Sequence, residues 1–384
     1  MSATPLAPVA QSNRLIAIDA LRGFALFGIV LVNAAFFALP LSQSIESDLS
    51  SLSPLDAASI IFVRLFAEQK FISLFSLLFG VGLAMQYERA RAKHAPFFGF
   101  AYRRLGILAV FGLVHAVGLW YGDVLFFYAI IGSVLVLLLP NKPSTLVLLG
   151  FIALLIAGVL GPLWFLLERL SPTASVTTLT ETLRGIDAIK AAQFNPEHPA
   201  WIAGEVEAHS NGPLIDSLLF NGIIWLWIVF IMLLGFSWNI TAMFLFGAAL
   251  WKSGFFTGDG QGVKWRRPLI VWGLPVGFAL ELLRTATSFD STPLGWQLLG
   301  IVAHQFGAAL LALAVASVFV TLLERRPLPG ASYLAATGRM SLTAYLLETV
   351  LFLTVVRFWG FGLFGSLSRL ELLGVSIGVY IVVT

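Results

Sequence analysis

IDALRGFALFGIVLVNA, residues 18–34, decides the fold class. Only Asp19, Arg22 and Asn33 interrupt its small and apolar residues, and the apolar run extends from 16 to 38. A helix that spans the bilayer needs about 20 mostly apolar residues, because each residue rises about 1.5 Å and the hydrocarbon layer is about 30 Å thick. The run is therefore predicted to be a transmembrane helix.

The composition of the whole chain agrees with this prediction. Hydrophobic residues make up 58% of the 384 residues and charged residues only 11%, whereas soluble proteins carry about 25% charged residues. The absence of cysteine excludes disulfides, thiolate metal sites and a cysteine nucleophile. No metal-ligand spacing occurs among the histidines, so no metal site is predicted. The net charge of +3 is small, and no nucleic-acid partner is expected.

The same length rule predicts an all-α, polytopic integral membrane bundle with about ten transmembrane helices. Residues 55–68 are predicted to form an amphipathic approach to the second span. Residues 219–235 are a further apolar stretch that could be a span, a re-entrant helix or an interfacial helix. The predicted spans lie near 16–38, 69–87, 100–120, 123–140, 145–167, 237–254, 268–287, 297–322, 335–357 and 364–384.

Charge predicts the orientation of the bundle. The segments 88–104, 252–267 and 324–326 are basic, or in the last case hold Glu-Arg-Arg, and the positive-inside rule places them in the cytoplasm. The loop 168–216 has more acidic than basic residues and is predicted to be an extracytoplasmic insert that forms short helices. These constraints agree if both termini are cytoplasmic and 219–235 does not span.

We accordingly predict a cytoplasmic N-terminal segment, 1–15, that is not a cleaved signal peptide. A single transmembrane domain, 16–384, would follow. The last span ends at Thr384 within an apolar run, which suggests that a C-terminal tail is missing.

Polar residues inside the first span form one stripe. Asp19 and Arg22 are three residues apart and can pair, and Asn33 returns to the direction of Arg22 after eleven residues, about 16 Å further along the helix. Charges inside a membrane are costly and mark bundle interiors or functional sites. A purely structural ion pair remains the alternative.

The third and fourth spans carry the strongest candidate for chemistry. Arg104 and His115 lie on one stripe of the third span, and Asp123 begins the fourth span after a short link, Gly118–Gly122. A carboxylate beside an imidazole fixes its tautomer and raises its basicity, as a general base requires. The alternative is a histidine that forms a hydrogen bond between helices.

Other polar residues in spans are candidates for substrate binding. Lys70, near the outer end of the second span, either extends to the interface or lines an outer mouth. Tyr345 and Glu348 share one face of the ninth span, and His304 in the eighth span is a second candidate base. Arg22, Lys70 or Arg357 could be the partner of Glu348. The loop residues His94, His198 and His209 are expected to be exposed.

Several segments together resemble one known family. These are IDALRGFALFGIVLVN at 18–33, KFISLFSLLFGVGLA at 70–84, RRLGILAVFGLVHAVGLWYGDVLFFYAIIG at 103–132, MFLFGAALWKSG at 243–254 and GRMSLTAYLLETV at 338–350. They are similar to segments of the YeiB-like branch of the transmembrane acyltransferase superfamily. The resemblance implies a ten-span acyltransferase bundle, cytoplasmic acyl-CoA as donor, an acceptor on the other side and a histidine near the outer mouth. The positions that it implies for the site are Asp19, Arg22, Lys70, His115, Asp123, Arg339 and Tyr345.

The predicted function is transfer of an acyl group, foremost acetyl, from acyl-CoA to a hydroxyl or amine of a sugar, glycolipid or amine acceptor. His115 and Asp123 would form the general base, with Asn33 or Tyr128 holding the oxyanion. The donor would be bound by Arg22, Arg103, Arg104 and Arg339. The expected location is the inner membrane of a bacterium, and a homodimer is left open. The alternative function is a transporter of a small polar or amphiphilic solute that uses the same ionisable residues.

Overall fold

The computed structural model describes residues 16–45, 49, 52–170, 183–258, 260–289, 291–325 and 329–384. Within these ranges the regular secondary structure is helical throughout, without a strand. The predicted cytoplasmic segment 1–15, residues 171–182 of the insert and Arg326 lie outside the described residues. The prediction of an all-α bundle is confirmed.

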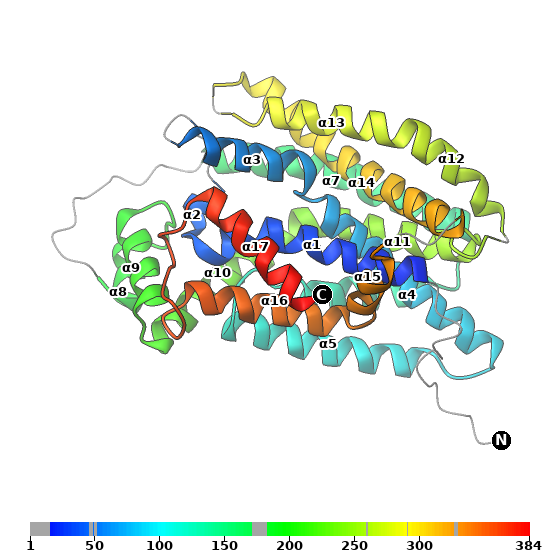
Figure 1. The fold of residues 1–384 in the computed structure, drawn as a ribbon, viewed down its shortest axis with the longest axis horizontal. Coiled ribbons are helices and arrows are strands. Elements are labelled where there is room, and N and C mark those ends of the chain that lie inside the picture. Colours follow the sequence, from blue (N-terminus) through cyan, green and yellow to red (C-terminus); the bar gives the residue numbers. More distant parts are fainter. Residues whose placement is uncertain are drawn as a thin grey trace.

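The helices run along the longest axis of the molecule (Figure 1). We call one end the insert end, because it carries α8 (Gly185–Ala191) and α9 (Pro199–Ser210). We call the other the basic end, because α4 (Lys70–Ala92) and α14 (Leu294–Arg325) finish there with basic residues in their last turns. The chain passes back and forth between these two ends.

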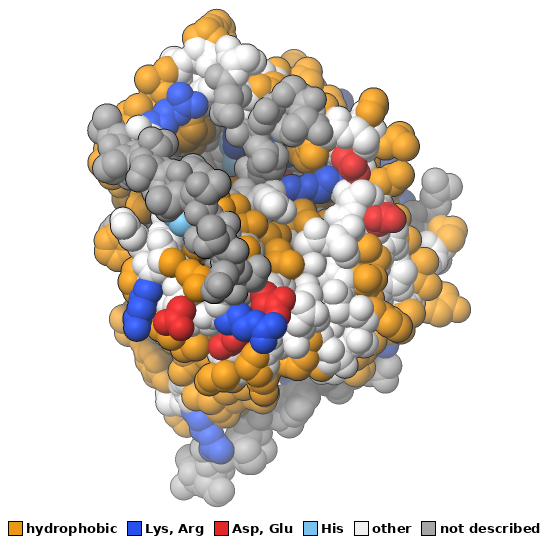
Figure 2. Space-filling view, turned by 90° about the vertical axis from the view of Figure 1, so that its left-hand side faces the viewer, with side chains coloured by type: hydrophobic (Ala, Val, Ile, Leu, Met, Phe, Trp, Pro, Cys, Tyr) orange, Lys and Arg blue, Asp and Glu red, His pale blue; other side chains and the backbone are white. Residues whose placement is uncertain are grey.

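Large apolar side chains are exposed along many helices, as expected of a surface that faces lipid. On the insert end, charged side chains gather on the end face, with hydrophobic ones around its rim (Figure 2). Among the described residues, seven helical segments are long and apolar enough to cross a membrane, or eight if the bent pair α15 and α16 counts as one. The chain is thus an integral membrane protein, and the count of ten spans stays a prediction.

α1 (Ile16–Ala38) packs against α4 and, at the basic end, against α15 (Ala331–Arg339). Two glycines allow α15 to approach closely, since a Cβ at Gly338 would lie 1.8 Å from Asp19 O and one at Gly23 would lie 2.1 Å from Leu334 O. The chain then bends by 90° into α16 (Ser341–Val356). α16 lies against α1 and so carries Tyr345 and Glu348 into the bundle.

The second span is longer than predicted and is broken. Ser53 is the N-cap of α3 (Pro54–Phe66), because its Oγ accepts a hydrogen bond from Asp56 N. Pro54 suits the first helical position. The helix stops after Phe66, and α4 starts at Lys70 after a left-handed residue, Gln69. Lys70 is the first residue of α4 and lies at the break within the segment Pro54–Ala92.

α5 (Phe98–Gly118) and α6 (Leu125–Leu138) form a hairpin whose turn, residues 119–124, lies toward the insert end. α7 (Pro143–Leu170) returns along the bundle to the insert. The predicted short helices of the insert are confirmed as α8 and α9, and the four-residue α2 (Leu41–Ser44) precedes α3.

The prediction that His198 and His209 are exposed was wrong, because both side chains are buried. His209 lies on α9, and its Nδ1 is 2.8 Å from Ser217 Oγ on the next helix. His198 Nδ1 accepts a hydrogen bond from Ala200 N at the start of α9. The insert therefore packs its own core against the bundle, whereas His94 is exposed as expected.

Residues 214–252 form one uninterrupted helical run. It consists of α10 (Leu214–Ile231), a π-helical turn η2 (Met232–Phe236) and α11 (Ser237–Lys252). α10 lies beside α8 and α9, and α11 continues toward the basic end (Figure 1). The predicted separation of 219–235 from 237–254 is thus corrected, because both stretches belong to the same pass.

The last part of the chain begins with a short 3₁₀ turn η3 (Gln261–Trp265). α12 (Arg266–Pro268), η4 (Leu269–Gly273) and α13 (Leu274–Ala286) follow as another continuous run. α13 packs along α14, and this pair lies over α3 and α7 (Figure 1). α17 (Arg369–Val383) starts with a capping box formed by Ser368 and Glu371, and it packs on α1.

Candidate functional site

The predicted proximity of His115 and Asp123 is confirmed. His115 Nδ1 lies 3.1 Å from Asp123 Oδ1, and both side chains are almost fully buried. Gly112 makes this approach possible, since a Cβ there would lie 2.4 Å from Phe126 N and 2.7 Å from Asp123 Oδ2. Asp123 Oδ2 accepts a hydrogen bond from Phe126 N at 2.9 Å, which fixes the carboxylate at the start of α6.

The other nitrogen of the imidazole faces a hydroxyl from a distant part of the chain. His115 Nε2 lies 3.2 Å from Thr349 Oγ1 on α16, 234 residues away. Thr349 Oγ1 also lies 3.1 Å from Tyr345 O. The imidazole of His115 thus lies between a hydroxyl and a carboxylate. In catalytic triads the same order lets the carboxylate orient a histidine that exchanges a proton with a hydroxyl.

This arrangement allows the imidazole both protonation states. When His115 is neutral with its proton on Nδ1, facing the Asp123 carboxylate, Nε2 can accept a hydrogen bond from Thr349. When His115 is protonated on both nitrogens, Thr349 can accept from Nε2 and turn its own hydrogen to Tyr345 O. The site can therefore hold a proton on His115 without leaving the hydroxyl of Thr349 unpaired.

Aromatic rings and several unpaired polar atoms complete the surroundings. The Tyr345 and Trp120 rings have their centroids 5.3 Å and 6.3 Å from that of His115. Among the described residues, Tyr345 Oη and Glu348 Oε1 are buried without a hydrogen-bond partner, and so are His115 Nδ1 and Asp123 Oδ1, which lie 3.1 Å apart without the geometry of a hydrogen bond. Buried polar groups are nearly always paired, so unpaired ones call for an explanation such as a functional role.

The predicted partners of Glu348 were not supported by the contacts. Lys70 forms an ion pair with Glu281, and Arg357 reaches Ser217 Oγ and Asn221 Oδ1. Arg22 pairs with Asp19 at 3.2 Å, as predicted, and its other guanidinium nitrogen donates to Leu78 O.

A second ionisable cluster surrounds Glu281, which the sequence analysis missed. The Glu281 carboxylate is fully buried, pairs with Lys70, and lies 3.0 Å from His304 Nδ1. Lys70 Nζ also donates to Arg64 O at 2.6 Å. The cluster joins α3 and α4 to α13 and α14, and the side chain of Lys70 is buried between them.

The remaining candidates are not brought to His115. Tyr128 donates or accepts a hydrogen bond with Ser76 on α4 at 2.6 Å. Asn33 is half-buried on α1, and no contact among the described residues joins it to His115. Neither residue is therefore placed as an oxyanion donor in this structure.

The predicted donor-binding arginines are spread over the basic end. Arg103 and Arg104 on α5 and Arg339 on α15 are all exposed. Arg104 donates to Gln86 Oε1 on α4 at 2.6 Å. No group of three or more potential metal ligands lies together in the part of the chain that the structure describes.

The sequence only weakly indicated that Thr349 and Glu281 belong to these clusters. Thr349 directly follows Glu348 and lies one helical turn beyond Tyr345, so the face that carries Tyr345 also carries Thr349. Glu281 stands alone among the apolar residues of 274–283, where an acid in a span should have been noted.

In the insert, Glu205 Oε2 accepts hydrogen bonds from Trp201 Nε1 at 3.0 Å and Leu41 N at 3.3 Å. Its burial raises the pKa of this carboxyl to about 7.

Comparison with known proteins places the chain in a family. The model of the family described as "Protein of unknown function (DUF418)" matches residues 250–384. The chain is 30% identical to the "Uncharacterized protein YeiB" of Escherichia coli, across 96% of this chain and 90% of that protein. It is 28% identical to the "Uncharacterized protein YxaH" of Bacillus subtilis, across 94% and 86%. No solved structure matches. The similarity to the Escherichia coli protein over nearly the full length of both chains shows that this chain belongs to the YeiB-like family.

Proposed function

We propose that the chain is a membrane-bound acyltransferase. It would move an acyl group, foremost acetyl, from cytoplasmic acyl-CoA to a hydroxyl or amine of a membrane-embedded or extracytoplasmic acceptor. The observation that supports this most is the buried line of Thr349, His115 and Asp123. A bacterial inner membrane is the proposed location, because the relatives are bacterial.

The proposed reaction uses His115 as general base. An acceptor hydroxyl replaces Thr349 at His115 Nε2 and gives its proton to the imidazole as its oxygen attacks the thioester carbonyl. The carbon–sulfur bond breaks, and the proton passes from His115 to the leaving thiolate. Asp123 keeps the imidazole oriented and stabilises its charged form. Such proton transfer contributes about 10²–10⁴ in rate.

His115 is nearly inaccessible in this structure, so substrates must displace part of its surroundings. The turn 119–124 lies next to His115 on the insert side. It is held by Trp120 Nε1 and Tyr121 Oη, which both donate to Phe36 O on α1, at 3.0 Å and 3.1 Å. Trp120 and Tyr121 are also buried in the core, and Asp123 belongs to the same turn, so the acceptor must reach His115 without displacing Asp123.

The test is binding and turnover of acyl-CoA by detergent-purified protein. Thermal shift measures binding of acetyl-CoA and longer acyl-CoAs, and release of free thiol measures turnover. His115→Ala should keep binding and lose turnover, whereas His94→Ala, at an exposed histidine, should change neither. Folded protein that neither binds nor hydrolyses any acyl-CoA would sink the proposal.

A second candidate is a proton-coupled transporter, which the cluster of Lys70, Glu281 and His304 favours. Intramembrane acids paired with bases are typical of proton relays. Reconstituted vesicles would then show solute flux driven by a proton gradient, lost in Glu281→Gln. Flux of this kind without turnover of acyl-CoA would decide for the transporter.

A further inference from the structure

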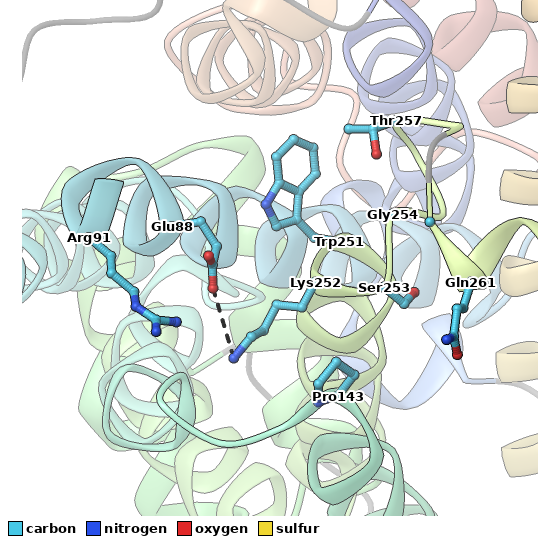
Figure 3. A pocket seen from close by; sticks show the side chains of 10 residues that line it. Glu88, Arg91, Pro143, Trp251, Lys252, Ser253, Gly254, Thr257 and Gln261 are labelled. Carbon is cyan, nitrogen blue, oxygen red and sulfur yellow. Dashed lines mark ion pairs between the residues drawn. The ribbon is translucent and has the colours of Figure 1, made fainter. Parts of the chain in front are cut away.

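A cavity of about 760 Å³ opens at the basic end of the bundle. The end of α4, the start of α7 and the turn that follows α11 form its walls (Figure 3). Pockets for small molecules commonly measure about 300–1,000 Å³, so the cavity has the size of a ligand site. None of the residues around His115 lines it.

Two cationic side chains line this cavity, and they differ in how many contacts hold them. Lys252 is held in place, because its Nζ donates to Leu139 O at 2.7 Å and to Asn141 O, and lies 4.0 Å from Glu88 Oε1. Arg91 is exposed in the cavity and has no hydrogen-bond or ion-pair partner among the described residues. The guanidinium of Arg91 is therefore available for an anion and offers several donors in one plane.

The wall formed by the end of α11 and the turn after it presents an aromatic ring and glycine backbone. Trp251 lines the cavity through its indole, next to Lys252 in the chain (Figure 3). The backbone turns at Gly254, whose φ is 73°, and passes close to itself at Gly260, where a Cβ would lie 2.1 Å from Ser253 O. Both glycines line the cavity, so this wall lets a ligand approach the main chain closely.

These groups suit the phosphate, the sugar and the base of a nucleotide. An unpaired guanidinium suits a phosphate, a carboxylate such as Glu88 accepts hydrogen bonds from sugar hydroxyls, and an indole stacks on a flat base. We propose that the cavity binds the nucleotide part of the acyl donor, an inference that rests on the proposed function. The nucleotide would thus sit against Arg91 and Trp251 and not at Arg103, Arg104 or Arg339, none of which lines the cavity.

The experiment titrates the full-length, detergent-purified protein with ADP and with coenzyme A by calorimetry. The test variant is Arg91→Gln, and the matched control is Arg89→Gln, which removes the same charge from the same helix outside the cavity lining. Trp251→Phe and Trp251→Ala provide a second pair, in which only Phe keeps a ring for stacking.

We expect both ligands to bind the wild type. Arg91→Gln should weaken both by about tenfold or more, since it removes a charge-assisted hydrogen bond. Arg89→Gln should change them less than about twofold, because exposed charges at a distance are screened. Trp251→Ala should weaken binding more than Trp251→Phe. Binding of ADP without binding of coenzyme A would show a nucleotide site that does not serve the acyl donor and would refute the inference.

Two other results would overturn the inference. If Arg89→Gln and Arg91→Gln weakened the binding of ADP and coenzyme A equally, the positive charge of the whole basic end would account for the binding. Turnover of acyl-CoA that is unaffected by Arg91→Gln and Trp251→Ala would place the donor elsewhere and leave the acyltransferase proposal standing.

Discussion

Removing the carboxylate of Glu281 should destabilise the protein severely. In Glu281→Gln the side chain keeps its shape, but the buried Lys70 ammonium loses its ion-pair partner and is left with Glu68 as a nearby acid. His304 Nδ1 loses the carboxylate 3.0 Å away. Breaking a buried ion pair by removing one partner costs about 3–5 kcal/mol. At about 2 °C per kcal/mol for a large chain, the apparent Tm should fall by about 6–10 °C.

An ion pair of the same chain in which the acid is exposed and the arginine buried provides the control. Glu324 pairs with Arg266, and the side chain of Glu324 is 46% exposed, so Glu324→Gln should cost less than about 1 kcal/mol. The double variant Lys70→Met with Glu281→Gln should regain most of the loss, because the ammonium that lost its partner is then removed as well.

The assay is thermal unfolding of the purified variants in one detergent at one scan rate. A shift in Glu281→Gln no larger than that in Glu324→Gln would refute the reasoning. So would a double variant whose loss equals the sum of the two single losses, since the pair would then be uncoupled.

Three further outcomes are expected. Asp123→Asn should lower acyl transfer by about a hundredfold or more with donor binding unchanged, because an amide cannot stabilise the protonated form of His115; steady-state kinetics that match the wild type would contradict this role. The raised pKa of Glu205, about 7 against an ordinary 4.5, means that the folded chain keeps a proton that the unfolded chain releases. Stability should therefore fall as the pH rises from 4.5 to 7, by up to about 3 kcal/mol, and apparent Tm values across this range should lose that dependence in Glu205→Gln. Gly338→Ala should destabilise the fold because its Cβ would collide with α1, whereas Gly378→Ala, which meets open space, should be harmless in the same thermal assay.

Local spacing was enough to predict one half of the candidate site. His115 and Asp123 are joined by a short glycine-flanked link, so a tight turn between two antiparallel spans had to bring them together. The Asp19–Arg22 pair followed in the same way from a separation of three residues on one helix. These contacts depend on helix geometry alone.

The contacts that the sequence did not reveal depend on which helices become neighbours. Thr349 meets His115 only because α15 bends by 90° into α16, and the hydrophobic pattern of a span does not encode such a bend. Lys70 looked like a residue at a membrane interface because the predicted span began near 69, with 55–68 as an amphipathic approach to it. The partner of Lys70 is an acid on a much later helix, and the length rule for spans carries no information about such pairing.

The pairing of Lys70 with Glu281 also bears on how the chain is assembled in the membrane during synthesis. The segment 250–384, which the family model matches, contains Glu281, but the counter-ion of that residue is supplied by α4. Each charge left alone at mid-membrane opposes insertion by about 2.5–3.5 kcal/mol. We therefore expect α4, which is synthesised earlier, to favour the insertion of α13 by supplying Lys70 as the ion-pair partner of Glu281. Expressed without α4, the segment 250–384 would keep only the contact of Glu281 with His304, so we expect it to insert poorly and to be degraded by quality-control proteases.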